Sequence, residues 1–380
     1  MIYIADIASV GSQHEQFNIS FTKLVELNNP GMELVYFSDA SHSSILAGRL
    51  ENVTFKDVDI YKNRGGFQEF IRGFCQYRDL SNIVRNADQI GAKTVYVLLL
   101  HPFGHLLFKL FTKHHANVRI VIHGELESVR FNKHFVNKIW GYFLTKAFAL
   151  QKPVVQYIIL GQSIFENLVK TVPSFKRQKA FILDHPYPFE EKPLKRPSEG
   201  KVVFSSLGVA TLAKDSQYLF EVAGRAHQLG FAGNVKFNVC GKVYKNMEPY
   251  LNDFVHYKAN HESLSRDEFD TLLCESDFAV FYYNNVHYSL CPSGAFWDAI
   301  NAEIPLLFVK NDYFDYYAKI AGPIGVAFDN PQDLNEYILQ LATKNLQSNT
   351  DYPIYVANIR RVKYEHMNFA NLSAQLKTIA

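Results

Sequence analysis

Short apolar runs rich in β-branched residues alternate with longer amphipathic stretches along the whole chain. Segments 2–7, 94–100 and 202–205 have the length and composition of buried strands, whereas 15–27 and 215–229 have helical periodicity. Strands that alternate with helices predict parallel sheets with helices on both faces. The pattern therefore predicts an α/β protein.

The alternation is interrupted at 186–200, a segment rich in proline and charge, which is typical of an interdomain linker. A length of 380 residues suits two domains. We therefore expect two Rossmann-like doubly wound domains that face a cleft. The expected divisions are a first domain over 1–187, a linker over 188–200, a second domain over 201–355, and a helical tail over 356–380 that crosses back to the first domain.

Composition argues against several classes of protein. A hydrophobic content of 48% argues against disorder, and a net charge of +2 without a basic arm argues against nucleic-acid binding. The four cysteines form no CxxC pair, so neither a disulfide framework nor structural zinc is expected. No apolar run is long enough to cross a bilayer, and the first residues do not read as a signal peptide. We expect a cytoplasmic protein, free or attached to a membrane from outside.

A phosphate site is predicted where Pro292-Ser293-Gly294 opens a helix over 295–302. Free backbone N–H groups at a helix start, with a serine hydroxyl and a glycine that permits close approach, suit a phosphate. Asp298, on the second turn, is placed to accept hydrogen bonds from ribose hydroxyls. The alternative is a helix capped by Ser293 with no ligand.

The stretch 288–307 resembles the nucleotide-sugar loop of the GT-B glycosyltransferases, whose large retaining family carries a pattern like E-G-F-G-L-P-x-L-E-A-x-A-x-G-x-P. The residues that fall on this pattern are Asp298, Ala299 and Pro305. Asp298 replaces the second Glu, which holds the ribose, and Glu303 stands where glycine is usual. Leu290 stands where the first Glu contacts the donor sugar, so the retaining mechanism lacks one hallmark.

Other loops resemble the family in the expected order, and the resemblance implies a donor site. The implied donor-binding residues are Gly208, Lys214, Gly241, Leu264, His287, Tyr288, Ser293, Gly294 and Asp298. Lys214 would contact the diphosphate, while Gly241 and Leu264 lie in loops near the base. His287 or Tyr288 would meet the sugar in place of the missing Glu, and a plain exposed turn is the alternative.

Candidate catalytic residues follow a predicted strand in the first half of the chain. His123 lies where the family often has a histidine that touches the donor sugar. Glu125 and Glu127 are the only acids in a stretch with eight Lys/Arg, and either is a candidate base for the acceptor hydroxyl. The alternative for each acid is an ion pair with Arg130 or Lys133.

Loops after the first and later strands provide the acceptor-side candidates, which are Gly11, His14, Glu15 and Gly104. We expect transfer that does not depend on a metal ion. The nucleotide-diphosphate sugar is then a substrate, and no cofactor is expected.

The stretch 129–152 carries five Lys/Arg and no acid among its aromatic and aliphatic residues. This composition suits peripheral contact with an anionic membrane. The alternative is a core helix with a basic outer face, and both can hold at once.

The sequence thus predicts a glycosyltransferase that moves a sugar to a hydroxyl of a glycan or lipid-linked acceptor. The resemblance implies bacterial surface polysaccharide or glycoconjugate assembly, at the inner face of the plasma membrane. The absence of Glu at 290 and the acids after His123 favour inversion. A GT-B-shaped sugar-nucleotide epimerase and a non-catalytic nucleotide-sugar-binding protein are the alternatives.

Overall fold

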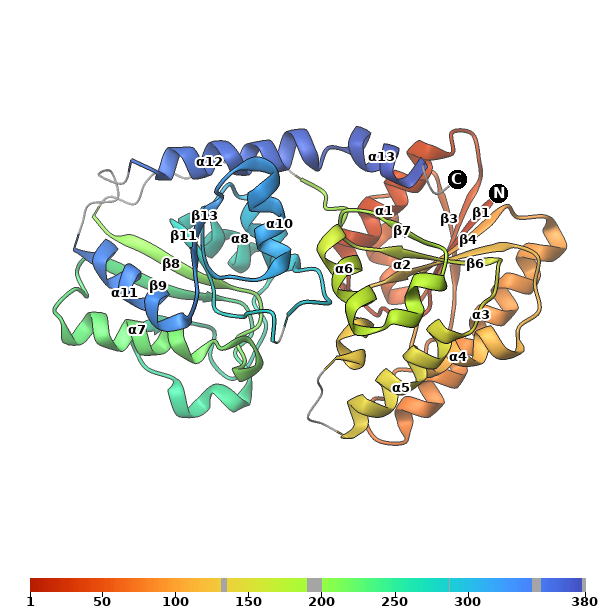
Figure 1. Ribbon diagram of the computed structural model, residues 1–380, viewed down its shortest axis with the longest axis horizontal. Coiled ribbons are helices and arrows are strands. Elements are labelled where there is room, and N and C mark those ends of the chain that lie inside the picture. The colour runs from red at the N-terminus through yellow and green to blue at the C-terminus, as the bar shows by residue number, and fades with distance from the viewer. Residues whose placement is uncertain (131–134, 190–199, 287, 344–349, 378–380) are drawn as a thin grey trace. The chain divides into compact units, whose positions relative to one another are not determined.

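The computed structural model describes residues 1–130, 135–189, 200–286, 288–343 and 350–377, and the chain divides into two compact units (Figure 1). Residues 190–199, most of the predicted linker, lie outside the described part. The first unit comprises Met1–Pro188, Leu290–Pro292 and Phe369–Ala380, and the second comprises Phe189–Ser289 and Ser293–Asn368. Each unit is described by itself.

The first unit contains a seven-stranded parallel sheet with the order β3-β2-β1-β4-β5-β6-β7. The strands are β1 (Ile2–Asp6), β2 (Leu34–Ser38), β3 (Val53–Asp57), β4 (Thr94–Leu99), β5 (Asn117–Ile122), β6 (Val155–Ile159) and β7 (Ala180–Ile182). Most strands are buried along their length, as expected for a sheet covered on both faces. Because the order reverses between β1 and β4, the loops after these strands diverge at a topological switch point, where such sheets bind ligands.

Helices connect the strands of the first unit. They are α1 (Glu15–Asn28), α2 (Ala40–Ala47), α3 (Gln68–Ile90), α4 (Pro102–Phe111), α5 (Phe135–Ala149), α6 (Gln162–Thr171) and α13 (Phe369–Lys377), with 3-10 turns η1 (Gly124–Val129) and η2 (Pro173–Arg177). The C-terminal α13 belongs to this unit and packs on α1, where the Ser373 hydroxyl bonds to the Asn28 side chain.

The second unit contains a six-stranded parallel sheet with the order β10-β9-β8-β11-β12-β13. Its strands are β8 (Val202–Leu207), β9 (Val235–Cys240), β10 (Val255–His256), β11 (Phe278–Phe281), β12 (Leu306–Val309) and β13 (Gly325–Phe328). Its helices are α7 (Gln217–Gln228), α8 (Arg266–Glu275), α9 (Gly294–Asn301), α10 (Asp312–Ala321), α11 (Pro331–Ala342) and α12 (Tyr352–Arg360), with short turns η3 (Leu212–Lys214) and η4 (Lys245–Tyr250) and a π-helical turn η6 (Arg361–His366).

Stacked rings form the centre of the second core. Phe204 of β8 stacks on Phe237 of β9 and on Phe278 of β11, with ring centroids 5.6 and 5.8 Å apart. These three side chains alternate with residues that face the opposite side of their strands. Both units are therefore doubly wound α/β sheets, and the predicted fold class is confirmed.

A buried lysine in the first unit gives a pH-dependent prediction. Lys109 of α4 is 6% exposed and donates to the Tyr157 hydroxyl at 3.0 Å and to Gln178 Oε1 at 3.1 Å. Burial, aided by the charge of Lys152, lowers the pKa of Lys109 to about 7. The folded state therefore holds fewer protons than the unfolded state between about pH 7 and 10, so this group makes stability rise with pH there.

We expect Lys109→Met to raise the free energy of unfolding by about 1–3 kcal/mol at pH 6–7, because it removes a buried charge whose pKa burial has lowered. The gain should shrink as the pH rises from about 7 towards 10, because the folded wild-type amine is neutral there and the unfolded amine begins to lose its proton. Urea unfolding of both proteins at pH 6.5 and 9.5 measures the effect. An equal difference at both pH values would contradict it.

Candidate functional site

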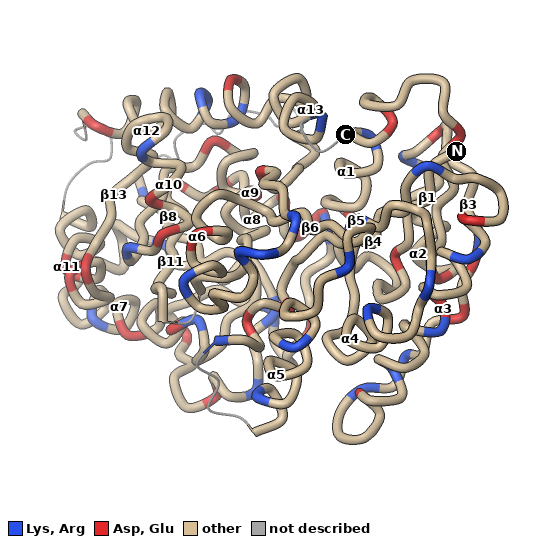
Figure 2. Tube along the Cα trace, turned by 45° about the vertical axis from the view of Figure 1, so that its right-hand side comes forward, with Lys and Arg blue, Asp and Glu red and all other residues tan. Residues whose placement is uncertain are grey.

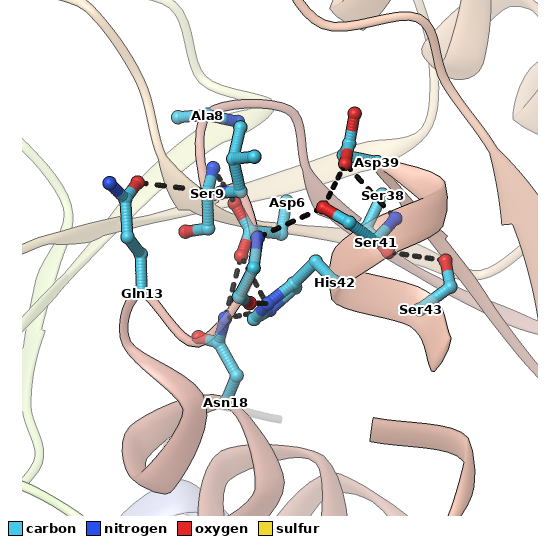
Figure 3. A network of polar contacts seen from close by, with 12 residues as sticks. Asp6, Ala8, Ser9, Gln13, Asn18, Ser38, Asp39, Ser41, His42 and Ser43 are labelled. Carbon is cyan, nitrogen blue, oxygen red and sulfur yellow. Dashed lines mark hydrogen bonds and ion pairs between the residues drawn. The ribbon is translucent and has the colours of Figure 1, made fainter. Parts of the chain in front are cut away.

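Asp6, the last residue of β1, is the centre of a buried polar network at the strand-end edge of the first sheet (Figure 3). Its carboxylate accepts from Asn18 Nδ2 of α1 at 2.6 Å and from the backbone N–H of Ser9 at 3.0 Å. His42 Nε2 of α2 lies 3.4 Å from the same carboxylate. Three segments that are distant in sequence are thus joined at one carboxylate.

His42 connects this network to the loop after β1. Its Nδ1 lies 2.5 Å from the carbonyl oxygen of Gly11, whose N–H donates to Ser41 Oγ at 3.1 Å. Burial opposes charge on both Asp6 and His42, but their mutual hydrogen bond and attraction outweigh it. The pKa of Asp6 is therefore lowered and that of His42 is raised. The ion pair fixes Gly11 and with it the loop that leads to His14.

Three histidines and a phenylalanine form a cluster beside this loop. The His123 ring, after β5, lies with its centroid 4.2 Å from Phe17, 4.9 Å from His14 and 5.5 Å from the parallel ring of His185. His123 is 5% exposed, and its Nε2 has no hydrogen-bond partner among the described residues. Burial, with the neighbouring histidines, holds the pKa of His123 well below its usual range and lowers that of His185 to about 3. His123 is thus neutral at pH 7 and has a ring nitrogen available for a hydroxyl.

Glu125 lies next to this cluster and joins two strand ends. Its Oε1 accepts from the N–H of Leu100 at 3.2 Å, and its Oε2 accepts from the N–H of His123 at 2.8 Å. Burial raises the pKa of Glu125 to about 7 despite these hydrogen bonds, and no lysine or arginine of the described residues forms an ion pair with it. A carboxyl group with this pKa is suited to accept a proton near neutral pH.

Glu127 has a cationic neighbour instead, because Arg130 Nη1 lies 3.9 Å from its Oε2. Burial raises the pKa of Glu127, and Arg130 opposes the rise. The other predicted ion-pair partner, Lys133, lies outside the described residues. The structure therefore distinguishes the two acids, and Glu125 has the environment of a base.

The acceptor-side candidates are only partly brought together. Gly11 and His14 belong to the loop held by His42, and Glu15 follows at the start of α1, with its carboxylate 4.0 Å from Arg49. Gly104 is buried in α4, where a Cβ would lie 2.5 Å from the carbonyl oxygen of Gly73 in α3. Close packing of two helices accounts for a glycine at 104 without any acceptor.

In the second unit, the loops after β8 and β9 run side by side. Gly208 has a positive φ of 82° and donates its N–H to the carbonyl oxygen of Cys240 at 2.9 Å. A Cβ at Gly241 would lie 2.0 Å from the carbonyl oxygen of Gly208. Gly241 is therefore required by the packing of the two loops, whatever it does for a ligand.

Lys214, in η3, reaches the space in front of Gly208. A Cβ at Gly208 would lie 3.6 Å from Lys214 Nζ and 3.5 Å from the Cβ of Ala295. The same Nζ lies 5.5 Å from the ring centroid of Tyr283 and 5.9 Å from that of Tyr288. The lysine, the glycine and the start of α9 thus lie close together.

Ser293 caps α9 with its own side chain, since its hydroxyl accepts from the N–H of Phe296 at 3.2 Å and lies 2.8 Å from the Tyr283 hydroxyl. A ligand at this helix start would therefore use the N–H groups of Gly294 and Ala295, which have no acceptor within the helix. A Cβ at Gly294 would meet no atom within 4 Å, so open space adjoins the helix start.

The remaining donor candidates are more scattered. Asp298 is 18% exposed on α9, 3.9 Å from Arg266 Nη1 of α8. Leu264 is half-buried just before α8, which Ser265 caps as part of a capping box. Tyr288 packs on Tyr283 at 4.4 Å, and His287 lies outside the described residues.

Sequence reasoning missed six contributors, namely Asp6, Phe17, Asn18, His42, His185 and Tyr283. Asp6, Tyr283 and His185 stand at or just after the ends of β1, β11 and β7. The rule that strand ends carry the site would have selected these three. Phe17, Asn18 and His42 lie within helices, and no local signal identifies them. In the described residues, no group of three His, Cys, Asp or Glu side chains is arranged to hold a metal ion.

Comparisons with known proteins show the fold. No family model matches the sequence, and no curated protein is similar to it at a significant level. Sucrose-phosphate synthase from Thermosynechococcus elongatus superposes with a TM-score of 0.66 at 12% identity, covering 100% of this chain and 97% of that one. HepE from Anabaena, in complex with UDP and glucose, superposes with a TM-score of 0.63 at 11% identity, covering 100% and 98%.

TarM from S. aureus, in a complex that includes UDP, superposes with a TM-score of 0.57 at 13% identity. That match covers 81% of this chain and only 58% of TarM. The chain therefore has the fold of GT-B glycosyltransferases, and at these identities the likeness extends to the fold alone.

Proposed function

We propose that the protein is a glycosyltransferase that moves a sugar from a nucleotide-diphosphate sugar to a hydroxyl of a glycan or lipid-linked acceptor. The observation that carries the proposal is the convergence of Gly208, Lys214 and the open start of α9 at the strand-end edge of the second sheet. Two proteins of the same fold, HepE and TarM, were crystallised with UDP, which supports this choice of ligand.

In this proposal the second unit binds the donor. The diphosphate accepts from the N–H groups of Gly294 and Ala295 and pairs with Lys214, which offsets charge on the leaving group. Asp298 holds the ribose, and Gly241 and Leu264 border the base. Tyr288 or His287 contacts the sugar. No resident metal or cofactor is part of the mechanism.

The first unit supplies the acceptor site and the base. Gly11, His14 and Glu15 border the acceptor, and the neutral ring of His123 bonds a sugar hydroxyl. Glu125 takes the proton of the acceptor hydroxyl, whose oxygen attacks the anomeric carbon on the face opposite the diphosphate. The bond from that carbon to the diphosphate oxygen breaks with its electron pair going to the diphosphate, so the product is inverted. We place the reaction in bacterial surface glycan assembly, at the inner face of the plasma membrane.

A thermal-shift screen against UDP, GDP, CMP and dTDP sugars identifies the donor, because a ligand that binds only the folded state raises Tm. We expect Gly294→Leu to abolish the shift. The open surroundings of Gly294 admit the side chain without strain, and the leucine then fills the phosphate space. Gly224→Leu is the matched control, since Gly224 also lies in a helix with no atom within 4 Å of its Cβ position.

If Gly294→Leu binds the nucleotide as tightly as wild type does, the donor does not bind at the start of α9. Conversion of the bound sugar nucleotide without any acceptor, followed by NMR of the donor, would identify an epimerase instead. If the protein binds a nucleotide tightly but catalyses neither sugar transfer nor epimerisation, it is a nucleotide-sugar-binding protein.

A further inference from the structure

The outer face of helix α5 combines large exposed rings with lysines. Its buried side consists of Trp140, Gly141, Leu144, Ala147 and Phe148. Its exposed side is also largely apolar, because Phe135 is 76% exposed and Tyr142 is 59% exposed. Large exposed rings of this kind are uncommon on a surface that faces only water. The exposed side of α5 therefore lacks a partner that suits it.

Charge on this exposed side has a single sign. Phe135, Lys138, Tyr142 and Lys146 follow one another at a spacing of three or four residues, so they form one stripe along the helix. Lys146 Nζ lies 5.3 Å from the ring centroid of Tyr142. From Phe135 to Ala149 the helix contains no acid, and blue segments mark it in Figure 2. The stripe therefore suits an anionic partner.

Aromatic rings continue from α5 onto the neighbouring helices, which lie beside it in Figure 1. Phe143 contacts Phe103 of α4 at 5.1 Å and Phe70 of α3 at 6.1 Å. Phe70 in turn contacts Phe67, which is 75% exposed. Half-buried rings of α3, α4 and α5 thus lie between two exposed phenyl rings, Phe135 on α5 and Phe67 just before α3.

We propose that this basic-aromatic face (Phe67, Phe135, Lys138, Tyr142, Phe143 and Lys146) docks on the surface of an anionic bilayer. The phenyl rings enter the boundary between headgroups and acyl chains, and the two lysines contact lipid phosphates. Among the described residues, no helix is long and apolar enough to cross a membrane, so the contact is peripheral. The inference goes beyond the proposed reaction, because docking does not depend on which sugar is transferred.

Co-sedimentation of the full chain with phosphatidylglycerol and phosphatidylcholine vesicles tests the proposal. We expect binding to phosphatidylglycerol that falls with added salt and only weak binding to phosphatidylcholine. Lys138→Gln with Lys146→Gln should weaken the partition about 10–30-fold. Phe135→Ser with Tyr142→Ser should weaken it by a similar factor on both lipids. The matched control is Leu229→Ala with Lys245→Gln, which removes an exposed leucine and an exposed lysine from the second unit and should bind as wild type does.

A Phe135→Trp variant gives an independent readout by fluorescence. A tryptophan at 135 should shift its emission to the blue when the protein binds vesicles, whereas Trp140 is already buried. The proposal would be overturned if the wild type did not bind phosphatidylglycerol vesicles at low salt. It would also be overturned if both double variants bound the vesicles as well as the control does. So would a dimer in light scattering that Phe135→Ser with Tyr142→Ser dissociates without any vesicle binding. The nucleotide thermal shift of the same variants should stay unchanged, so failure of docking is distinguishable from failure of the proposed reaction.

Discussion

Replacing Glu125 by glutamine should lower the turnover of sugar transfer by about 10²–10⁴-fold while leaving nucleotide affinity within a fewfold of wild type. The carboxyl group is the only one of the two candidate acids without a cationic neighbour in the described part of the chain, and burial brings its pKa to about 7. Turnover by the wild type should rise as the pH increases through about 7, because the base must be deprotonated, and the variant should lose this dependence.

Glu127→Gln is the matched comparison, since Arg130 already pairs with that acid, and we expect a much smaller loss. A glutamine at 125 has one acceptor oxygen where the carboxylate served two N–H groups, so Tm must be measured alongside. Wild-type turnover by both variants would show that neither acid is the base. The anomeric configuration of the product, measured by NMR, tests inversion separately, and retention of the donor's configuration would refute it.

Replacing Asp6 by asparagine should lower the free energy of unfolding by about 3–5 kcal/mol at pH 6, because it leaves the buried imidazolium of His42 without its counter-charge. Urea unfolding measures the loss. Asp329→Asn is the control, since that carboxylate forms an exposed, solvent-screened ion pair with Lys310 and its loss should cost far less. Equal losses in the two variants would show that burial of the Asp6 pair has no special effect.

The pH dependence of this pair follows from the directions of its two pKa shifts. The raised pKa of His42 means that its contribution is complete below about pH 6.5 and is lost as the pH rises through the folded pKa. The lowered pKa of Asp6 means that its contribution is complete above about pH 3.8 and is lost as the pH falls through the folded pKa. The pair therefore stabilises most between about pH 4 and 6.5, and Asp6→Asn should remove this window.

Local sequence pattern determined the fold class. Strands β4 and β5 are short and rich in β-branched residues. Ser265 and Ser293 cap α8 and α9 by accepting a hydrogen bond from the backbone N–H three residues later. Such features depend on residues close in sequence, so they can be read without the rest of the fold. The segment between β2 and β4 gave no such signal: β3 is a half-exposed edge strand, and the long α3 carries many polar residues among its apolar ones.

Tertiary structure alone decided the character of the site. Glu125 is an ordinary acid in sequence, and its raised pKa results from burial between the ends of β4 and β5. His14, His123 and His185 are far apart along the chain, and a parallel sheet brings their loops to one edge. Gly241 matches a family turn in sequence, but the carbonyl oxygen of Gly208 is what excludes a side chain there. Burial and long-range pairing are properties of the packed chain, because they depend on which distant segments displace water from a group.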